Sequence, residues 1–174
     1  MALAPWLFAD YRRVNAMSRT EAEASLDWDE HPTRESSMLE PSARGLNIFF
    51  DVDNTIITWD VKLRPGVHEV FQQLRTDGHT IYLWSGMGPR WEVVKRFELH
   101  EHITDCFWKP LTDHHARMEQ LGIPVWPDYV IDDHVEIIQA FTGLHVPEPK
   151  LPLERDREMW RVYDEIQRFV SGPG

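Results

Sequence analysis

A short apolar run at residues 48–50 ends abruptly in two carboxylates, Asp51 and Asp53. The run has the length of a buried strand, and isoleucine and phenylalanine suit a packed, pleated environment. Two acids one residue apart are costly to bury without a partner charge. In open α/β sheets, however, the carboxyl end of a strand is where ligands bind. The two acids either solvate a turn or form a chemical site, and the pattern in the rest of the chain distinguishes these interpretations.

Apolar runs typical of buried strands alternate with helix-spaced apolar residues from Gly45 onward. We expect strands at residues 47–50, 80–84, 105–108, 129–131 and 143–146. We expect helices after Pro65, after Pro89 with Trp91, Val94 and Phe97 on one face, near His114, after Asp133, and at 153–170. Short connections between these elements imply a mostly parallel sheet with helices on both faces. The sequence predicts an α/β fold, a three-layer α/β/α sandwich with a Rossmann-like sheet.

The charge and the hydropathy pattern exclude two classes of partner. The net charge is −11, whereas nucleic-acid binding relies on Lys and Arg against phosphates. No apolar run approaches the roughly 18 residues of a membrane span, and the first residues lack the basic region of a signal peptide. We therefore expect a protein that binds neither nucleic acid nor membranes.

The cysteine content indicates the compartment. A single cysteine, Cys106, excludes an internal disulfide framework and fits a reducing environment. Phe107 and Trp108 follow it, so we expect Cys106 to be a small buried hydrophobe. A cytoplasmic location is the corresponding expectation.

Residues 1–44 differ from the rest of the chain. A short amphipathic stretch containing Trp6 and Phe8 precedes a polar segment with prolines, serines and mixed charges. We interpret residues 1–44 as an N-terminal extension, partly helical or linker, and residues 45–174 as the α/β domain. The extension is a tail or, as the alternative, a docking segment or lid.

Polar side chains follow four of the predicted strands. They are Asp51 with Asp53, then Ser85, then Lys109, and finally Asp132 with Asp133. Because parallel strands place their carboxyl ends at one edge of the sheet, these groups can converge. One acid pair alone is weak evidence, but four polar strand ends in this order favour a catalytic site.

This order resembles the haloacid dehalogenase-like (HAD) hydrolase superfamily. The matching residues are Asp51-Val-Asp53-Asn-Thr55 for its first motif, Ser85 for the second, Lys109 followed by Pro110 for the third, and Ile131-Asp132-Asp133 for the fourth. The resemblance covers roughly residues 46–146. Asn54 stands where many members carry glycine, a departure that leaves the reacting groups untouched.

The resemblance implies a role for each carboxylate. Asp51 would attack phosphorus to form an aspartyl-phosphate, and Asp53 would act as general acid and then as general base. Mg²⁺ would be held by Asp51, the backbone carbonyl of Asp53, and Asp132. Asp133 would ligate the metal, bind it through water or orient Lys109, and we expect Asp132 to be the direct ligand.

The remaining motif residues would bind the phosphoryl group. Ser85, with Gly86 beside it, would contact a phosphoryl oxygen, and Lys109 would neutralise charge in the transition state. Asp53 speaks against a dehalogenase, which needs no acid at that position.

The spacing of the motifs leaves no room for a cap domain. About 30 residues separate Asp53 from Ser85, and one helix and one strand use most of them. The chain is thus similar to the capless, magnesium-dependent phosphatases of the superfamily. An open site favours a phosphoprotein, or a phosphorylated small molecule covered by a second subunit of a homo-oligomer.

Two functions stay open at this point. The first is a Mg²⁺-dependent phosphomonoesterase, that is, a HAD-type phosphatase. The second is a non-catalytic phosphate-binding or scaffold protein with the same fold. The presence of both Asp51 and Asp53 favours the enzyme, because a binding module needs no nucleophile and acid together.

Overall fold

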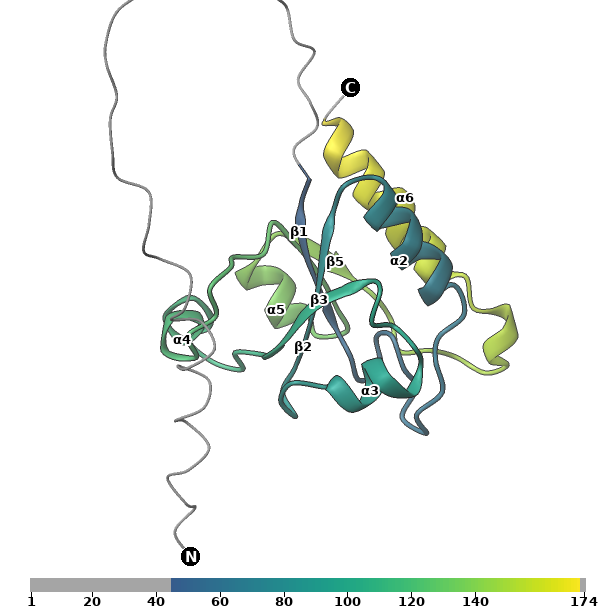
Figure 1. The fold of residues 1–174 in the computed structure, drawn as a ribbon, viewed down its shortest axis with the longest axis horizontal. Helices are drawn as coiled ribbons and strands as arrows, with labels where there is room; N and C mark the ends of the chain where they lie inside the picture. Colours follow the sequence, from purple (N-terminus) through teal and green to yellow (C-terminus); the bar gives the residue numbers. More distant parts are fainter. Residues whose placement is uncertain (1–44, 173–174) are drawn as a thin grey trace, which may run out of the picture. The chain divides into compact units, whose positions relative to one another are not determined.

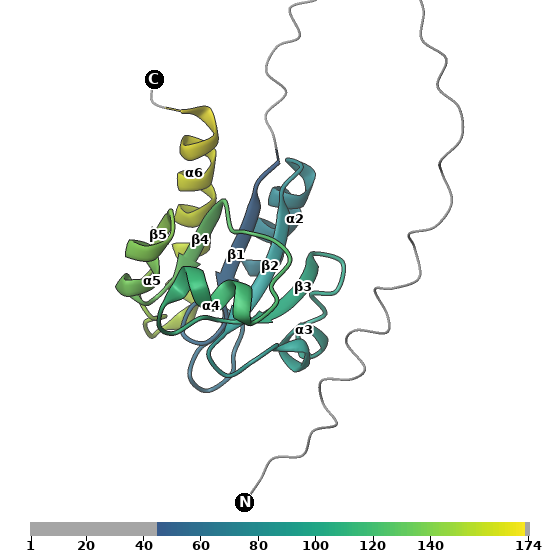
Figure 2. The same ribbon diagram turned by 90° about the vertical axis from the view of Figure 1, so that its left-hand side faces the viewer.

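Five parallel strands form the centre of the computed structural model, which describes residues 45–172 (Figure 1). The strands are β1 (Asn47–Asp51), β2 (Thr80–Ser85), β3 (Ile103–Trp108), β4 (Tyr129–Asp132) and β5 (Gly143–His145). Figure 2 shows them side by side in the order β3-β2-β1-β4-β5. The predicted parallel α/β sheet is confirmed.

The order of the strands creates a switch point at β1. Phe50 of β1 lies opposite Leu83 of β2 on one side and opposite Ile131 of β4 on the other. The chain runs from β1 outward to β2 and β3, then returns to β4 and continues to β5. Ligands of open α/β sheets bind outside the carboxyl ends of the strands at such a reversal. Asp51 and Asp132 end the two strands that flank it.

Helices cover both faces of the sheet, as predicted (Figure 1). The helices α2 (Val67–Thr76), α3 (Trp91–Arg96) and α6 (Glu158–Ser171) contribute to one core, and α4 (His114–Gln120) and α5 (Val135–Ala140) to the other. Because successive side chains of a strand point to opposite faces, Phe50 packs against Phe71 of α2. Phe49 faces the other way and stacks on Tyr82. Cys106 is buried, as expected.

Two helices differ from the sequence expectation. In α3 the buried residues are Val93 and Val94, whereas Trp91 is exposed; a helix of six residues presents too short a face for the expected spacing to hold. The C-terminal helix begins at Glu158, after a separate 3₁₀ turn, η2 (Leu153–Arg155). Asp156 accepts a hydrogen bond from the Glu158 amide at 2.8 Å, which satisfies one of the free amides at the start of α6.

No large cap domain interrupts the described residues: a single helix, α2, lies between β1 and β2, and a single helix, α3, between β2 and β3. Within residues 45–172 we also find no helix with the length and apolar character needed to cross a bilayer. The expectations for the N-terminal extension, residues 1–44, lie outside the described part of the chain.

Candidate functional site

Three of the predicted site residues meet at the carboxyl edge of the sheet. The ammonium Nζ of Lys109 lies 2.7 Å from Asp51 Oδ1, and 3.2 and 3.1 Å from the two carboxylate oxygens of Asp132. Their side chains are 5, 3 and 0% exposed for Lys109, Asp51 and Asp132 respectively. The polar strand ends of β1, β3 and β4 therefore converge in a buried cluster.

This cluster carries an excess of negative charge, because two buried carboxylates face one ammonium. Burial, together with the nearby Asp132, raises the pKa of Asp51 to about 7. Burial also raises the pKa of Asp132 despite its contact with Lys109. Burial opposes the charged form of Lys109, but Asp51 and Asp132 outweigh it and raise the pKa of the ammonium. Charge of the opposite sign beside the two carboxylates would relieve the cluster.

One oxygen of the cluster has no partner. Asp51 Oδ1 accepts a hydrogen bond from Lys109, but the buried Oδ2 makes no hydrogen bond with any described residue. A buried acceptor without a partner is costly and rare in native proteins, so it calls for an explanation. Asp51 thus presents a lone carboxylate oxygen that is suited to a cation or an electrophile.

The loop after β1 positions Asp53. The amides of Thr55, Ile56 and Ile57 all donate to the carbonyl of Val52, at 3.4, 3.1 and 3.1 Å, which closes a tight turn. Asn54 has a φ of 60°, in the left-handed region that asparagine tolerates better than most residues. The turn therefore explains why asparagine is tolerated at this position.

Asp53 is held at this turn by two side chains. Arg90 Nη1 donates to Asp53 Oδ1 and Oδ2 at 2.6 and 2.5 Å, and the Ser85 hydroxyl donates to Oδ2 at 2.9 Å. Ser85 was among the predicted site residues, whereas Arg90 was not. The signal available was a cation five residues beyond a strand-end serine.

Ser85 and Gly86 border the same site. The Ser85 hydroxyl accepts a hydrogen bond from the Met87 amide at 3.0 Å, and the Ser85 carbonyl accepts one from the Lys109 amide. The side chain of Leu111 lies over Gly86, so a Cβ at Gly86 would meet it at 3.2 Å. The loops after β2 and β3 are thereby joined at the edge of the site.

The contacts of Asp133 differ from one of its expected roles. Among the described residues, Lys109 contacts Asp132 rather than Asp133, so the expectation that Asp133 orients Lys109 is wrong. Asp133 instead accepts from His134 Nδ1 at 2.7 Å, and this contact raises the pKa of His134 against the opposing effect of burial. The reason is that β4 ends at Asp132, so the chain has already turned away at Asp133.

The end of β4 carries a group of side chains that fits a divalent cation. Asp132 and Asp133 can each offer a carboxylate oxygen and His134 a ring nitrogen, and these ligand atoms lie within 4.8 Å of one another. Asp51 is joined to Asp132 through their shared contact with Lys109. Carboxylate oxygens are the protein ligands that Mg²⁺ prefers. His134 was not among the predicted residues, although it directly follows the acid pair in the sequence.

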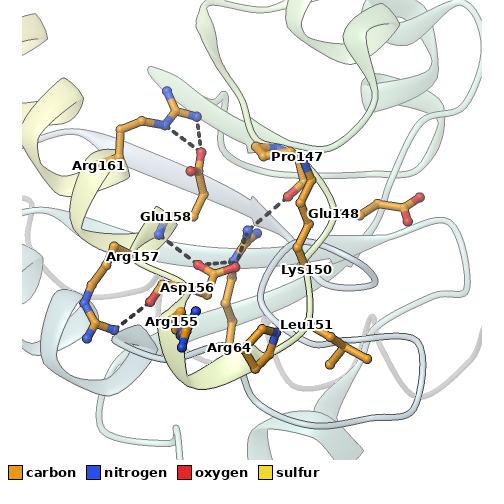
Figure 3. A pocket seen from close by; sticks show the side chains of 11 residues that line it. Arg64, Pro147, Glu148, Lys150, Leu151, Arg155, Asp156, Arg157, Glu158 and Arg161 are labelled. Carbon is orange, nitrogen blue, oxygen red and sulfur yellow. Dashed lines mark hydrogen bonds and ion pairs between the residues drawn. The ribbon is translucent and has the colours of Figure 1, made fainter.

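A buried arginine, Arg64, joins two loops of the domain (Figure 3). Arg64 donates to the carbonyl of Thr55 at 3.1 Å, to the carbonyl of Pro147 at 3.0 Å, and to both carboxylate oxygens of Asp156. It thus ties the loop that follows the first acid pair to the segment between β5 and α6. An open cavity of about 580 Å³ lies beside this pair.

The chain was compared with known proteins by sequence. No protein-family model matches it, and no curated protein matches it either.

Proposed function

We propose that this protein is a Mg²⁺-dependent phosphomonoesterase, a capless HAD-type hydrolase that acts through an aspartyl-phosphate on Asp51. The observation that carries the proposal is the buried excess of negative charge around Lys109, with Asp51 Oδ2 left without a partner among residues 45–172. Burial of such a cluster is costly for stability alone. Binding of a cation and of an electrophilic phosphorus atom would explain why the cluster is buried at this cost.

In the first half of the reaction, the lone Oδ2 of Asp51 attacks phosphorus as the bond to the leaving oxygen breaks. A protonated Asp53 gives its proton to that leaving oxygen. In the second half, Asp53 takes a proton from water, and the water oxygen attacks phosphorus. Inorganic phosphate leaves, and the Asp51 carboxylate is restored.

The other residues stabilise charge. Lys109, already within hydrogen-bonding distance of Asp51, neutralises negative charge on the phosphoryl oxygens, and Ser85 and the backbone at Gly86 donate to them. Mg²⁺ bound by Asp51, the Asp53 carbonyl and Asp132, with Asp133 directly or through water, would let an anionic nucleophile approach an anionic phosphoryl group.

The substrate is a phosphorylated small molecule or a phosphoprotein. Within the described residues no cap covers the site, which supports either a macromolecular phosphate or a small substrate enclosed by a second subunit. The net charge of −11 opposes a nucleic-acid substrate. A reducing, cytoplasmic location fits the single buried cysteine.

A non-catalytic phosphate-binding protein of the same fold is the second candidate. One observation favours it: the carboxylate of Asp53, the proposed acid, is already engaged by Arg90 and Ser85. A binding protein could keep that contact permanently, whereas an enzyme has to release it.

Hydrolysis of p-nitrophenyl phosphate, with Mg²⁺ and with EDTA, separates the two candidates. We expect Mg²⁺-dependent turnover that Asp51→Asn reduces by more than about a hundredfold, roughly 2.7 kcal/mol in the barrier. Asp164→Asn is the matched control, because it makes the same change at an exposed position of α6.

Acid quenching of the wild-type reaction should in addition leave a phosphoryl group on the peptide that contains Asp51. Phosphate binding without turnover would favour the second candidate. An Asp51→Asn variant that kept more than a tenth of the wild-type rate would show that Asp51 is not the nucleophile.

A further inference from the structure

Arg90 is the cation nearest to the proposed acid, and the mechanism above gives it no role. It is the residue before α3, and its Nη1 lies between the two carboxylate oxygens of Asp53. Its Nε donates to Glu92, which holds the guanidinium from the other side. Its Nη2 makes no hydrogen bond with any residue of the described part of the chain. Part of the guanidinium fork is therefore free.

The Arg90–Asp53 pair is more accessible than the buried cluster. The Asp53 side chain is 42% exposed and the Arg90 side chain 15%, whereas Asp51 and Lys109 are nearly inaccessible. Ser85 links the two groups, because its hydroxyl donates to Asp53 and its carbonyl accepts from the Lys109 amide, so a phosphate bound at Asp51 and Ser85 would lie close to the Arg90–Asp53 pair. At that point Asp53 is unavailable, because both of its oxygens accept hydrogen bonds from Arg90.

We propose that Arg90 is a phosphate-binding residue that exchanges partners when substrate enters. In the free protein it holds Asp53. A phosphoryl group offers the guanidinium a bidentate partner with more negative charge than one carboxylate, so Nη1 and the free Nη2 move to phosphoryl oxygens. Glu92 keeps the guanidinium near its place through Nε. Asp53 is released only when substrate is present, and the freed carboxylate then takes a proton from solvent and can pass it to the leaving oxygen.

The inference rests on the proposed function, because it assumes that the site takes phosphate. The partner exchange predicts a result that a purely structural role of Arg90 does not predict. If phosphate has to break the Arg90–Asp53 pair, removing the Asp53 charge should strengthen phosphate binding even though it impairs turnover. That gain should be larger when Arg90 is present than when it is absent, since only then is a pair broken on binding.

Calorimetric titration of the full chain with inorganic phosphate in the presence of Mg²⁺ tests the exchange. The proteins are wild type, Arg90→Gln, Asp53→Asn and the double variant, which together form a double-mutant cycle. We expect Arg90→Gln to weaken phosphate binding at least tenfold. We expect Asp53→Asn to tighten binding severalfold in the wild-type background, and clearly less in the Arg90→Gln background.

Arg96→Gln is the matched control, because Arg96 ends the short helix that Arg90 precedes and its guanidinium lies over the Phe97 ring. It should leave phosphate binding unchanged. In turnover of p-nitrophenyl phosphate, Arg90→Lys should raise KM more than it lowers kcat, because lysine keeps the charge but loses the fork.

The outcomes separate this inference from the function on which it rests. A wild-type protein that binds no phosphate would overturn both. A wild-type protein that binds and hydrolyses phosphate esters, while Arg90→Gln binds phosphate equally well, would overturn the exchange alone. Equal gains from Asp53→Asn in both backgrounds would show that Arg90 stays on Asp53 during binding, which also overturns it.

Discussion

The buried pair of Arg64 and Asp156 should contribute heavily to the stability of the domain. The two side chains are 1 and 7% exposed, and the Arg64 Nη2 lies 2.9 Å from Asp156 Oδ2. Asp156→Ala would leave the guanidinium with two carbonyl acceptors, those of Thr55 and Pro147, and without an opposite charge. Removing one partner of a buried pair typically costs about 3–5 kcal/mol, because the remaining charge stays desolvated.

The same substitution removes a hydrogen bond at the start of α6, since Asp156 Oδ1 accepts the Glu158 amide. Loss of such a hydrogen bond adds about 1 kcal/mol. At roughly 3 °C per kcal/mol, a total loss of about 5 kcal/mol should lower the melting temperature by about 15 °C. Domains of this size are stable by roughly 5–15 kcal/mol, so the variant should keep only part of that margin at 25 °C. The change should appear as a lower urea midpoint with an unchanged slope.

Urea unfolding followed by tryptophan fluorescence measures this loss, since the chain contains eight tryptophans. The control is Glu165→Ala, which breaks the exposed pair with Arg168 on α6 and should cost no more than about 1 kcal/mol. If Asp156→Ala cost as little as Glu165→Ala, burial would not set the strength of the Arg64 pair, and the reasoning would be refuted.

Three further predictions concern the site. The metal-free protein should lose stability as pH rises from about 4 to about 7. Burial, together with Asp132, raises the pKa of Asp51 from 3.8 to about 7. Over this pH range the folded protein therefore retains a proton that the unfolded chain releases. Urea midpoints in EDTA should depend less on pH in Asp51→Asn, and parallel profiles for the two proteins would contradict this origin. Asp132→Ala should raise the Mg²⁺ concentration for half-activity far more than Asp133→Ala does, because Asp132 is the fully buried strand-end carboxylate beside Lys109. If a Mg²⁺ titration gave Asp132→Ala the same half-activity concentration as the wild type, Asp132 would not be a metal ligand. Asp53→Asn should slow hydrolysis of alkyl phosphates more than that of p-nitrophenyl phosphate, whose leaving group needs little protonation, and equal slowing in a leaving-group series would argue against the acid role.

The side chains that meet at the site could be predicted where they follow a strand directly. Asp51, Lys109 and Asp132 each end or follow a strand, and parallel strands bring their carboxyl ends to one edge whatever the loops do. The short connections between alternating strands and helices predicted the helices on both faces of the sheet in the same way. For these residues, local pattern and sheet geometry are sufficient.

The contacts of Arg90 and Arg64 could not be predicted, because they depend on where loops lead a long side chain. Arg90 reaches Asp53 across 37 residues of sequence, and Arg64 reaches Asp156 across 92. Asp133 belongs to the same class, because β4 ends at Asp132 and the contacts of the next residue depend on the path of the loop. Periodicity carries no information about such contacts, since each depends on the backbone path between elements.

The sequence by itself determined the parallel sheet, its helical cover and the edge where the polar strand ends gather, because these follow from hydrophobic pattern and chain connectivity. The tertiary structure alone decided which groups pair there: Lys109 between Asp51 and Asp132, Asp53 with Arg90, and Asp133 with His134. The physical reason is that a pair of charges forms only where the fold sets both the distance and the exclusion of water, and both are properties of the packed molecule.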